Sequence, residues 1–484
     1  MHKAINFHII FKVIGRILLI ISGFMLLNIL IAIYFSESTY PFTHTLLYTG
    51  TLGLLLFIIT FRKDMHHEMT QHDAFITVTI AWTVIGLAGS LPYVFSGGIP
   101  HFVNAYFESV SGFTTTGSSI LTDIEALPKS ILFWRSLTHW IGGIGIILLV
   151  IILMPSLKVS GYQMFTLESS LQEKIKPKIR KVGLRLFYIY LTLTVAEVIF
   201  LLAGGMNLFE STCHAFGTVA TGGFSPKNDS IASYSPYIQY VIMSFMLLAG
   251  INFVLYYYMI KREFNRIKRN EEVRFYFGVL FLIGTFLTMA LYFKMGKPLE
   301  ESFREAYFQT ISIITCTGFA TADYLKWPAF AVLVIFMSMF FGGSTGSTAG
   351  GIKMVRHLIL FKNIKRRFKQ TMHPQAVMPI RLNKSHMKDS TNQSVLTFII
   401  IYLFVFLIGS LLMLTTGLDI PTATSSIATC MAGIGPGIGG VGPVSNFALI
   451  SDTGKVILII FMLLGRLEIY TILVLFTKSF WKDY

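Results

Sequence analysis

The sequence predicts an all-α membrane protein in which four helix, pore-loop and helix repeats surround one pore. Three observations predict it. The 484 residues are 54% hydrophobic and 13% charged, with a mean hydropathy of +0.66, which is too apolar for a soluble multidomain protein. Apolar runs of membrane-spanning length recur along the whole chain. Four short loops of similar design follow four shorter amphipathic stretches, so one unit is written four times.

The formal net charge of +15 could indicate a nucleic-acid-binding protein. The basic residues, however, gather in the gaps between apolar runs, as in the cytoplasmic loops of membrane proteins. No basic soluble domain is present to carry nucleic-acid binding. We therefore expect membrane lipids, and no nucleic acid, as partners.

About ten stretches are long and apolar enough to be spanning helices. The first two precede the repeats as an extra N-terminal pair. The predicted spans cover residues 14–34, 45–61, 74–95, 131–153, 184–203, 238–260, 275–293, 330–341, 396–414 and 456–476.

Shorter pieces that cannot cross a bilayer lie between the later spans. Each mixes apolar and polar residues over about three turns, which is typical of a re-entrant half-helix buried among other helices. These pieces are 101–113, 208–219, 302–314 and 421–431. The order span, half-helix, loop and span therefore repeats four times. We predict an N-terminal helix pair in 1–70 and pore repeats in 71–156, 183–262, 273–368 and 394–484.

The loop after each half-helix is the predicted ion site. A single such turn would be an ordinary helix connection, but four of them after four half-helices predict a ring of backbone carbonyls, which is how proteins remove water from potassium. Glycine permits the backbone dihedrals that this needs. Thr115, Thr221 and Thr317 are expected to turn their hydroxyls into the surrounding protein. The predicted selectivity-filter residues are Thr114, Thr115, Thr116 and Gly117 (loop 1); Ala220, Thr221, Gly222 and Gly223 (loop 2); Thr315, Cys316, Thr317 and Gly318 (loop 3); and Ala432, Gly433, Ile434 and Gly435 (loop 4).

The basic gaps predict the orientation. By the positive-inside rule these gaps and both termini lie in the cytoplasm, so the half-helices enter from outside and point four partial negative charges at the membrane centre. That arrangement favours cations. The basic residues are Arg62, Lys63, Lys158, Lys174, Lys176, Lys178, Arg180, Lys181, Lys261, Arg262, Arg266, Lys268, Arg269, Arg356, Lys362, Lys365, Arg366, Arg367 and Lys369.

Two features concern the region just below the predicted filter. Residues 342–351 form a glycine-rich run in the middle of a spanning segment, and irregular backbone at that depth must line a cavity or be enclosed by protein. A kinked helix or an external linker is the alternative. Arg466 lies inside the last apolar span, where it either faces the pore or forms a structural ion pair with Glu468 or another buried carboxylate. The residues concerned are Gly342, Gly343, Gly346, Gly350, Gly351 and Arg466. Glu108, in the first half-helix, is expected to be a buried hydrogen-bonding brace.

The residue sequences of several motifs are specific to one protein family. Phe107-Glu108-Ser109 leads to Gly112-Phe113 and loop 1, and the further motifs are Gly222-Gly223-Phe224-Ser225, Gly318-Phe319, Gly435-Pro436-Gly437 and Gly465-Arg466-Leu467-Glu468. In these motifs, and over nearly its whole length, the chain resembles Trk-type potassium uptake proteins of the TrkH/TrkG/KtrB/HKT superfamily, especially its TrkH branch. The chain departs from the family pattern at Ala432 and Gly433, where an Asn pair is usual. It also departs at Cys316, where a small or hydroxyl residue is more usual.

The resemblance implies a homodimer in the bacterial inner membrane, with one pore in each subunit. It also implies a TrkA-like cytosolic nucleotide-binding regulator, an intramembrane gating loop at 342–351 and a pore-barrier arginine at Arg466. The chain itself carries no P-loop or Rossmann motif, so no nucleotide cofactor is expected within it.

The predicted function is potassium uptake through a gated, filter-containing pore, with the potassium ion as cargo. A sodium-selective or cation-coupled symporter on the same scaffold is the alternative; Gly117 favours potassium, and serine there would favour sodium. A membrane-embedded enzyme or anchor would need a convergent catalytic cluster, which the spans do not show, so we expect no enzymatic activity.

Overall fold

The computed structural model describes residues 5–61, 70–152, 179–376 and 378–482. Within these ranges the regular secondary structure is helical, apart from one two-stranded antiparallel ribbon, β1 (Arg381–Leu382) and β2 (Ser385–His386). The all-α prediction is confirmed. Several of the basic residues used for the predicted orientation lie outside the described residues: Arg62, Lys63, Lys158, Lys174, Lys176 and Lys178.

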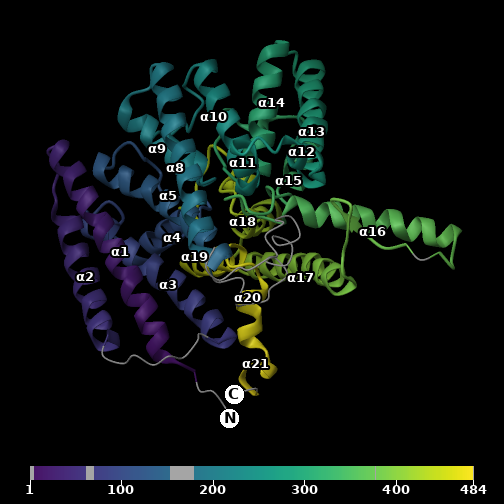
Figure 1. Cartoon of the computed structure of the whole chain (residues 1–484). Helices are drawn as coiled ribbons and strands as arrows, with labels where there is room; N and C mark the ends of the chain where they lie inside the picture. Colours follow the sequence, from purple (N-terminus) through teal and green to yellow (C-terminus); the bar gives the residue numbers. More distant parts are fainter. Residues whose placement is uncertain (1–4, 62–69, 153–178, 377, 483–484) are drawn as a thin grey trace.

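Two N-terminal helices form one flank of the molecule (Figure 1). α1 (Phe7–Tyr34) and α2 (Tyr40–Phe61) pack against each other, and α1 also contacts the body through α3 (Gln71–Phe95). The Asn6 side chain caps α1 by accepting from the amide of Ile9. Thr70 and Asp73 form a capping box that begins α3, so polar caps fix both starts.

Long apolar helices make up the frame. In the described part of the chain six helices are long and apolar enough to cross a membrane, or up to eight if each of two bent pairs is one span. The six are α1, α2, α3, α8 (Ile179–Ala203), α13 (Glu271–Met295) and α17 (Asp389–Leu414). α5 (Lys129–Ile152) fills a further predicted span.

Four short helices match the predicted half-helices to within three residues at each end. They are α4 (Phe102–Phe113), α9 (Leu208–Val219), α14 (Leu299–Ile314) and α18 (Ile420–Ala432). Asn207 caps α9 and Asp419 caps α18 through their side chains. Each half-helix packs against the helices that precede and follow it, and α4 also contacts α19 (Asp452–Arg466) of the last repeat. The first and fourth repeats are therefore neighbours.

The predicted span 238–260 is broken by a bend. The chain forms α10 (Pro236–Ala249) and α11 (Phe253–Ile260), bent by 93°. The break is held by distant partners: the amide of Phe253 donates to the Gly346 carbonyl at 3.1 Å, and the Gly250 carbonyl accepts from the amide of Ser344 at 2.9 Å. The Asn252 side chain then caps α11.

The predicted last span, 456–476, is also broken. α19 ends at Arg466, and α20 (Tyr470–Leu473) with the 3-10 helix η3 (Val474–Phe476) continues at 108° to it. Glu468 stands in the break with φ +54°, and its carboxylate forms an ion pair with the guanidinium of Arg356. That pair compensates both charges inside the bend.

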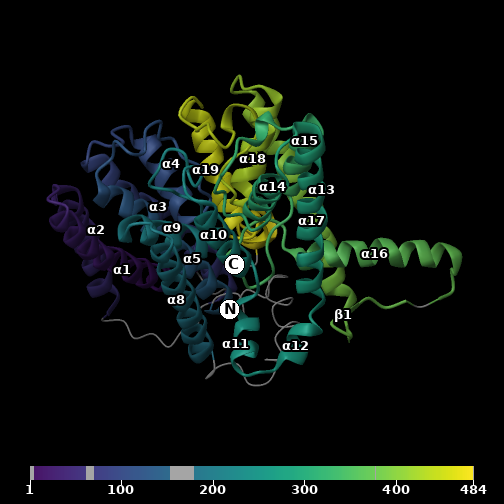
Figure 2. The ribbon, with the colours of Figure 1, turned by 90° about the horizontal axis from the view of Figure 1, so that it is seen from above.

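The predicted span 330–341 is wrong as well. α15 (Ala329–Ser338) has ten residues, half of what a bilayer requires. An irregular loop follows and leads into α16 (Met354–Met372), which extends sideways from the body, away from α1 and α2 (Figures 1 and 2). The remaining elements are α12 (Phe264–Lys268), α21 (Lys478–Lys482) and the 3-10 helices η1 (Tyr324–Lys326) and η2 (Gly439–Val441).

Candidate functional site

All four half-helices end in the same way. The amide of the third residue of each loop donates to the carbonyl five residues earlier: Thr116 to Ser111, Gly222 to Gly217 and Thr317 to Ser312 at 2.8 Å, and Ile434 to Thr429 at 3.0 Å. This is the bond of a Schellman cap, whose second loop residue must be left-handed. Four copies of one helix ending give four loops of one shape.

The second residue of each loop is left-handed as the cap requires. Its φ is +53° at Thr115, +55° at Thr221, +57° at Cys316 and +69° at Gly433. Only loop 4 has glycine there. A β-branched residue at positive φ is a genuine outlier and costs of the order of 1–3 kcal/mol, so loops 1 and 2 hold local strain.

The fourth residue of each loop is a glycine pressed against the next loop. A Cβ atom at Gly117 would overlap the carbonyl oxygen of Gly222 in loop 2; at Gly223, that of Thr317 in loop 3; at Gly318, that of Ile434 in loop 4. At Gly435 it would lie 3.0 Å from the Thr116 oxygen in loop 1. Loop 1 therefore contacts loop 2, loop 2 contacts loop 3, loop 3 contacts loop 4, and loop 4 contacts loop 1. The four loops form a closed ring, in which the third-residue carbonyl of each loop lies against the glycine of the loop before it.

Hydroxyl groups brace loops 1 and 3 in the same manner. Thr114 donates to the Val110 carbonyl at 2.7 Å and shares a 2.8 Å hydrogen bond with Thr116. Thr315 and Thr317 repeat this arrangement in loop 3, at 2.7 and 2.8 Å. In loop 3 the brace includes Thr317, which bonds to Thr315 of its own loop, whereas in loop 1 the bracing hydroxyls are those of Thr114 and Thr116 and not that of Thr115. Thr221 donates within its own loop, to the Ala220 carbonyl.

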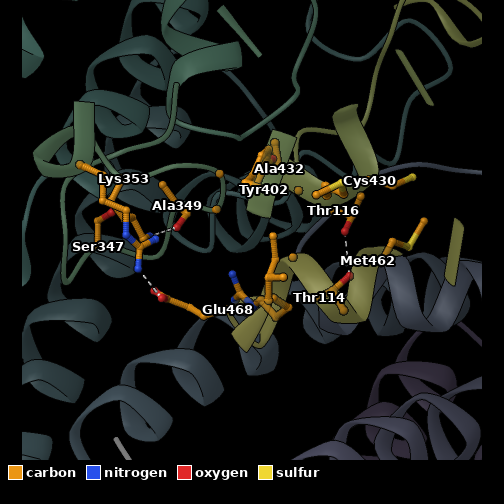
Figure 3. A pocket seen from close by; sticks show the side chains of 18 of the residues that line it. Thr114, Thr116, Ser347, Ala349, Lys353, Tyr402, Cys430, Ala432, Met462 and Glu468 are labelled. Carbon is orange, nitrogen blue, oxygen red and sulfur yellow. Dashed lines mark hydrogen bonds and ion pairs between the residues drawn. The ribbon is translucent and has the colours of Figure 1, made fainter. Parts of the chain in front are cut away.

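The ring separates two cavities. The outer one, of about 240 Å³, is lined by the fourth-residue glycines of all four loops. The inner one, of about 60 Å³, is lined by residues of loops 1 and 4 and by the irregular loop that precedes α16. Figure 3 shows the inner cavity, with Thr114 and Thr116 on one side of it and Ser347, Ala349 and Lys353 on the other.

Helix α5 positions loop 2. Its Arg135 lies with the guanidinium carbon 3.5 Å from the centre of the Phe224 ring, and His139, one turn on, stacks on the same ring at 4.1 Å between centroids. Arg135 also donates to the Ser225 carbonyl at 2.9 Å and to the Glu108 carboxylate at 2.6 Å. The two α5 side chains thereby fix the residues that follow Gly223.

Glu108 is the expected brace. It is fully buried, and besides Arg135 it accepts from the Ser119 hydroxyl and the Ile120 amide, both at 2.9 Å. Sequence reasoning did not single out Arg135. The signal that drew attention to Arg466, a charged residue inside an apolar span, was equally present at Arg135.

The predicted gating run lies directly beneath the ring. A Cβ atom at Gly350 would overlap the carbonyl oxygen of Ala432, and the Thr348 hydroxyl donates to the Val219 carbonyl at 3.0 Å. Fully buried Glu272 on α13 holds the run to the start of α16, since its Oε1 accepts from the amides of Thr345 in the run at 2.7 Å and Val355 in α16 at 3.1 Å. The run is therefore enclosed by protein and is neither a kinked helix nor an external linker.

The remaining predicted gating glycines serve different contacts. The Gly342 amide donates to the Ile352 carbonyl at 2.9 Å, and the Gly343 carbonyl accepts from Met354 at 3.1 Å, so the two ends of the run lie together. Gly346 and Gly351 have φ of +79° and +67°, a conformation that glycine adopts at low cost. These bonds close the run into a compact loop.

Arg466 lines the inner cavity. Its guanidinium donates to the carbonyls of Thr348 at 3.1 Å and Gly142 at 2.9 Å. The alternative pairing with Glu468 is not formed, because that carboxylate pairs with Arg356. Arg466 thus ties the irregular loop to α5 through neutral acceptors, and no carboxylate in the described residues forms a salt bridge with it.

The electrostatics of the ring suit a cation. The C-terminal ends of α4, α9, α14 and α18 meet at the four loops, and each such end carries about half a negative charge. Across the described ranges, His, Cys, Asp and Glu side chains form no group of three that could hold a metal. Backbone carbonyls between two cavities inside a frame of spanning helices define the class: a multi-pass membrane cation transporter.

Comparison with known proteins gives the family. The TrkH family model, described as a cation transport protein, matches residues 42–483. The chain is 35% identical to the Trk system potassium uptake protein TrkH of Escherichia coli (strain K12), covering 99% of this chain and 100% of that protein. It is 31% identical to TrkG of the same strain, with 97% of each covered. The crystal structure of the potassium transporter TrkH from Vibrio parahaemolyticus superimposes with a TM-score of 0.90 at 32% identity, over 98% of this chain and 100% of that one. The chain belongs to the TrkH family, and the resemblance seen in the sequence is confirmed.

Proposed function

We propose that this chain is the pore-forming subunit of a potassium uptake system in the bacterial inner membrane. One observation carries the proposal: the four loops form a closed ring, in which the third-residue carbonyl of each loop lies beside the fourth-residue glycine of the preceding loop. Carbonyl rings replace the hydration shell of potassium. The proposed ion site comprises all four residues of loops 1 to 4, and the proposed gate comprises residues 342–351 with Arg466. The potassium uptake function named for its relatives supports the assignment.

The same proposal includes an orientation with both termini in the cytoplasm. The start of α1 and helix α21 meet at the beginning of α3, since the amide of Asn6 donates to Asp73 at 2.9 Å and Phe480 packs on Phe75. The two ends therefore share one side. We also propose the four pore repeats with the boundaries predicted from the sequence.

The test is a flux assay on the purified full-length chain in liposomes. We expect tracer rubidium and potassium to enter at least about tenfold faster than sodium, without need of a pH gradient. Uptake that requires an imposed proton or sodium gradient would support the coupled symporter. Faster sodium than potassium entry would contradict the proposal, and protein-free liposomes supply the background.

A second expectation concerns assembly. We propose a homodimer, with one pore in each subunit, that docks a nucleotide-binding cytosolic regulator on its basic face. Arg366 and Arg367 lie on the projecting helix α16, where Arg367 is exposed, and positive patches steer acidic partners. Copurification from native cells should recover such a regulator.

Substituting both Arg366 and Arg367 by glutamine should reduce recovery of the regulator several-fold, because an exposed charge pair contributes up to ~1 kcal/mol of binding free energy. Arg16→Gln, an exposed charge on α1, is the matched control and should leave recovery unchanged. Attraction of α16 to anionic lipid is the alternative; it predicts unchanged regulator recovery and weaker retention on anionic vesicles. Normal regulated uptake in cells that lack any such regulator would contradict this expectation.

A further inference from the structure

The outer cavity contains a charge that a cation pore must neutralise. Two cationic side chains line it, Arg135 and Lys227, and its lining in the described residues includes no carboxylate. Lys227 is partly exposed and lies 3.6 Å from both Glu125 and Glu210, so water screens it. Arg135 is 2% exposed and has no such screening.

Arg135 stands at the mouth of the ring. It lines the same cavity as Gly117 and Gly223, and guanidinium stays protonated at every physiological pH. A buried unit charge at this place repels an entering cation far more strongly than one in water would. The guanidinium also has a structural function, because its hydrogen bond to Ser225 and its contact with Phe224 hold the chain after loop 2.

The Glu108 carboxylate compensates the charge of Arg135 from outside the cavity lining. It lies in α4, outside the cavity lining, with side-chain exposure of 0%. Its Oε1 accepts from Arg135 Nε at 2.6 Å and from Ser119, and its Oε2 accepts from the amide of Ile120. The carboxylate therefore contacts the chain after loop 1 while it cancels the charge that holds the chain after loop 2.

We propose that Glu108 and Arg135 act as one unit that determines which ions enter the ring. Arg135 is a positioning residue that joins the ends of loops 1 and 2, and Glu108 removes the electrostatic barrier that this positioning would otherwise create. The inference rests on the proposed potassium pore and adds a requirement for charge balance at its outer mouth. It predicts opposite electrostatic consequences for the loss of either partner.

The test uses full-length variants in liposomes, with rubidium uptake and its inhibition by external magnesium as readouts. Glu108→Gln keeps the shape of the brace and leaves Arg135 uncompensated; we expect uptake to fall at least about tenfold. Arg135→Gln leaves a buried carboxylate at the mouth, which attracts divalent cations; we expect magnesium to inhibit at a concentration at least about tenfold lower. The double variant should regain most of the uptake lost in Glu108→Gln and show ordinary magnesium sensitivity.

Glu125→Gln is the matched control, because Glu125 faces the partly exposed Lys227 beside the same cavity; its uptake should stay within about twofold of the parent. Uptake by folded Glu108→Gln within that same range, or a double variant no better than Glu108→Gln, would overturn the inference. If Glu108→Gln does not assemble, Arg135→Gln decides, since unchanged magnesium sensitivity there overturns the inference. A parent protein that takes up no rubidium in the same vesicles overturns the proposed function itself.

Discussion

Gly117→Ser is expected to raise sodium entry relative to potassium entry at least about tenfold. Gly117 has φ +80°, and a Cβ atom there would overlap the carbonyl oxygen of Gly222 in the neighbouring loop. The substitution therefore both strains its own backbone and displaces a carbonyl of the ring. Strain of this kind costs of the order of 1–3 kcal/mol, which is sufficient for the expected change because ~1.4 kcal/mol is a factor of ten.

Gly97→Ser separates the two causes. Gly97 also has positive φ, +71°, but no atom lies within 4 Å of the Cβ that serine would add. It should impose similar backbone strain without touching the ring, and the ion preference should not change. The measurement is the ratio of rubidium to sodium uptake per folded protein in liposomes. An unchanged ratio in folded Gly117→Ser would mean that loop 1 does not contact the ion.

Arg466→Ala is expected to raise basal potassium flux while leaving the ion preference intact. The guanidinium lines the inner cavity and makes its hydrogen bonds to the carbonyls of Thr348 and Gly142, so its positive charge faces the path below the ring. Repulsion between unit charges at ~4 Å and an effective dielectric of ~20 is about 4 kcal/mol. Relief of only a third of that would speed conduction about tenfold.

Two further variants assign the cause of that increase. Arg466→Lys retains the charge but cannot bridge both carbonyls in the same way, and its flux should stay near that of the parent if the charge is the barrier. Deletion of Gly346 to Thr348 removes one acceptor of Arg466 and shortens the loop, and should also raise flux. Rubidium uptake per folded protein is the measurement. Reduced uptake in both Arg466→Ala and the deletion would rule out a gating role and leave Arg466 as a structural tie.

The half-helices could be predicted to within a few residues because their signals are local. Each has an amphipathic pattern of about three turns, and each ends where its cap requires a left-handed residue. The fourth-residue glycines could likewise be predicted, because the loops need backbone dihedrals that glycine adopts at low cost. The structure adds a second reason, since a Cβ atom at Gly117 or Gly223 would collide with a neighbouring loop. The left-handed state of Thr115 could not, because Thr seldom adopts it and only the surrounding ring imposes it.

The breaks in the spans were missed because they depend on contacts between distant parts of the chain. The hydropathy of residues 238–260 predicts one apolar helix. The bend exists because Phe253 and Gly250 form hydrogen bonds to the loop at 344–346 in place of helical ones. The second bend is held by the ion pair of Glu468 with Arg356, which lies 112 positions away. Hydropathy reports burial and length, and it carries no information about such partners.

One chain supplies all four sides of the ring, and the sides are not equivalent. Loops 1 and 3 carry the paired threonine hydroxyls, whereas loops 2 and 4 have Ala220 and Ala432 in the first position. A substitution in a pore built from four identical chains alters every side at once; here it alters a single quadrant. If the proposed ion site is right, ion preference can therefore be changed one loop at a time, and diagonal pairs of substitutions, in loops 1 and 3 or in loops 2 and 4, become distinct perturbations of the same ring.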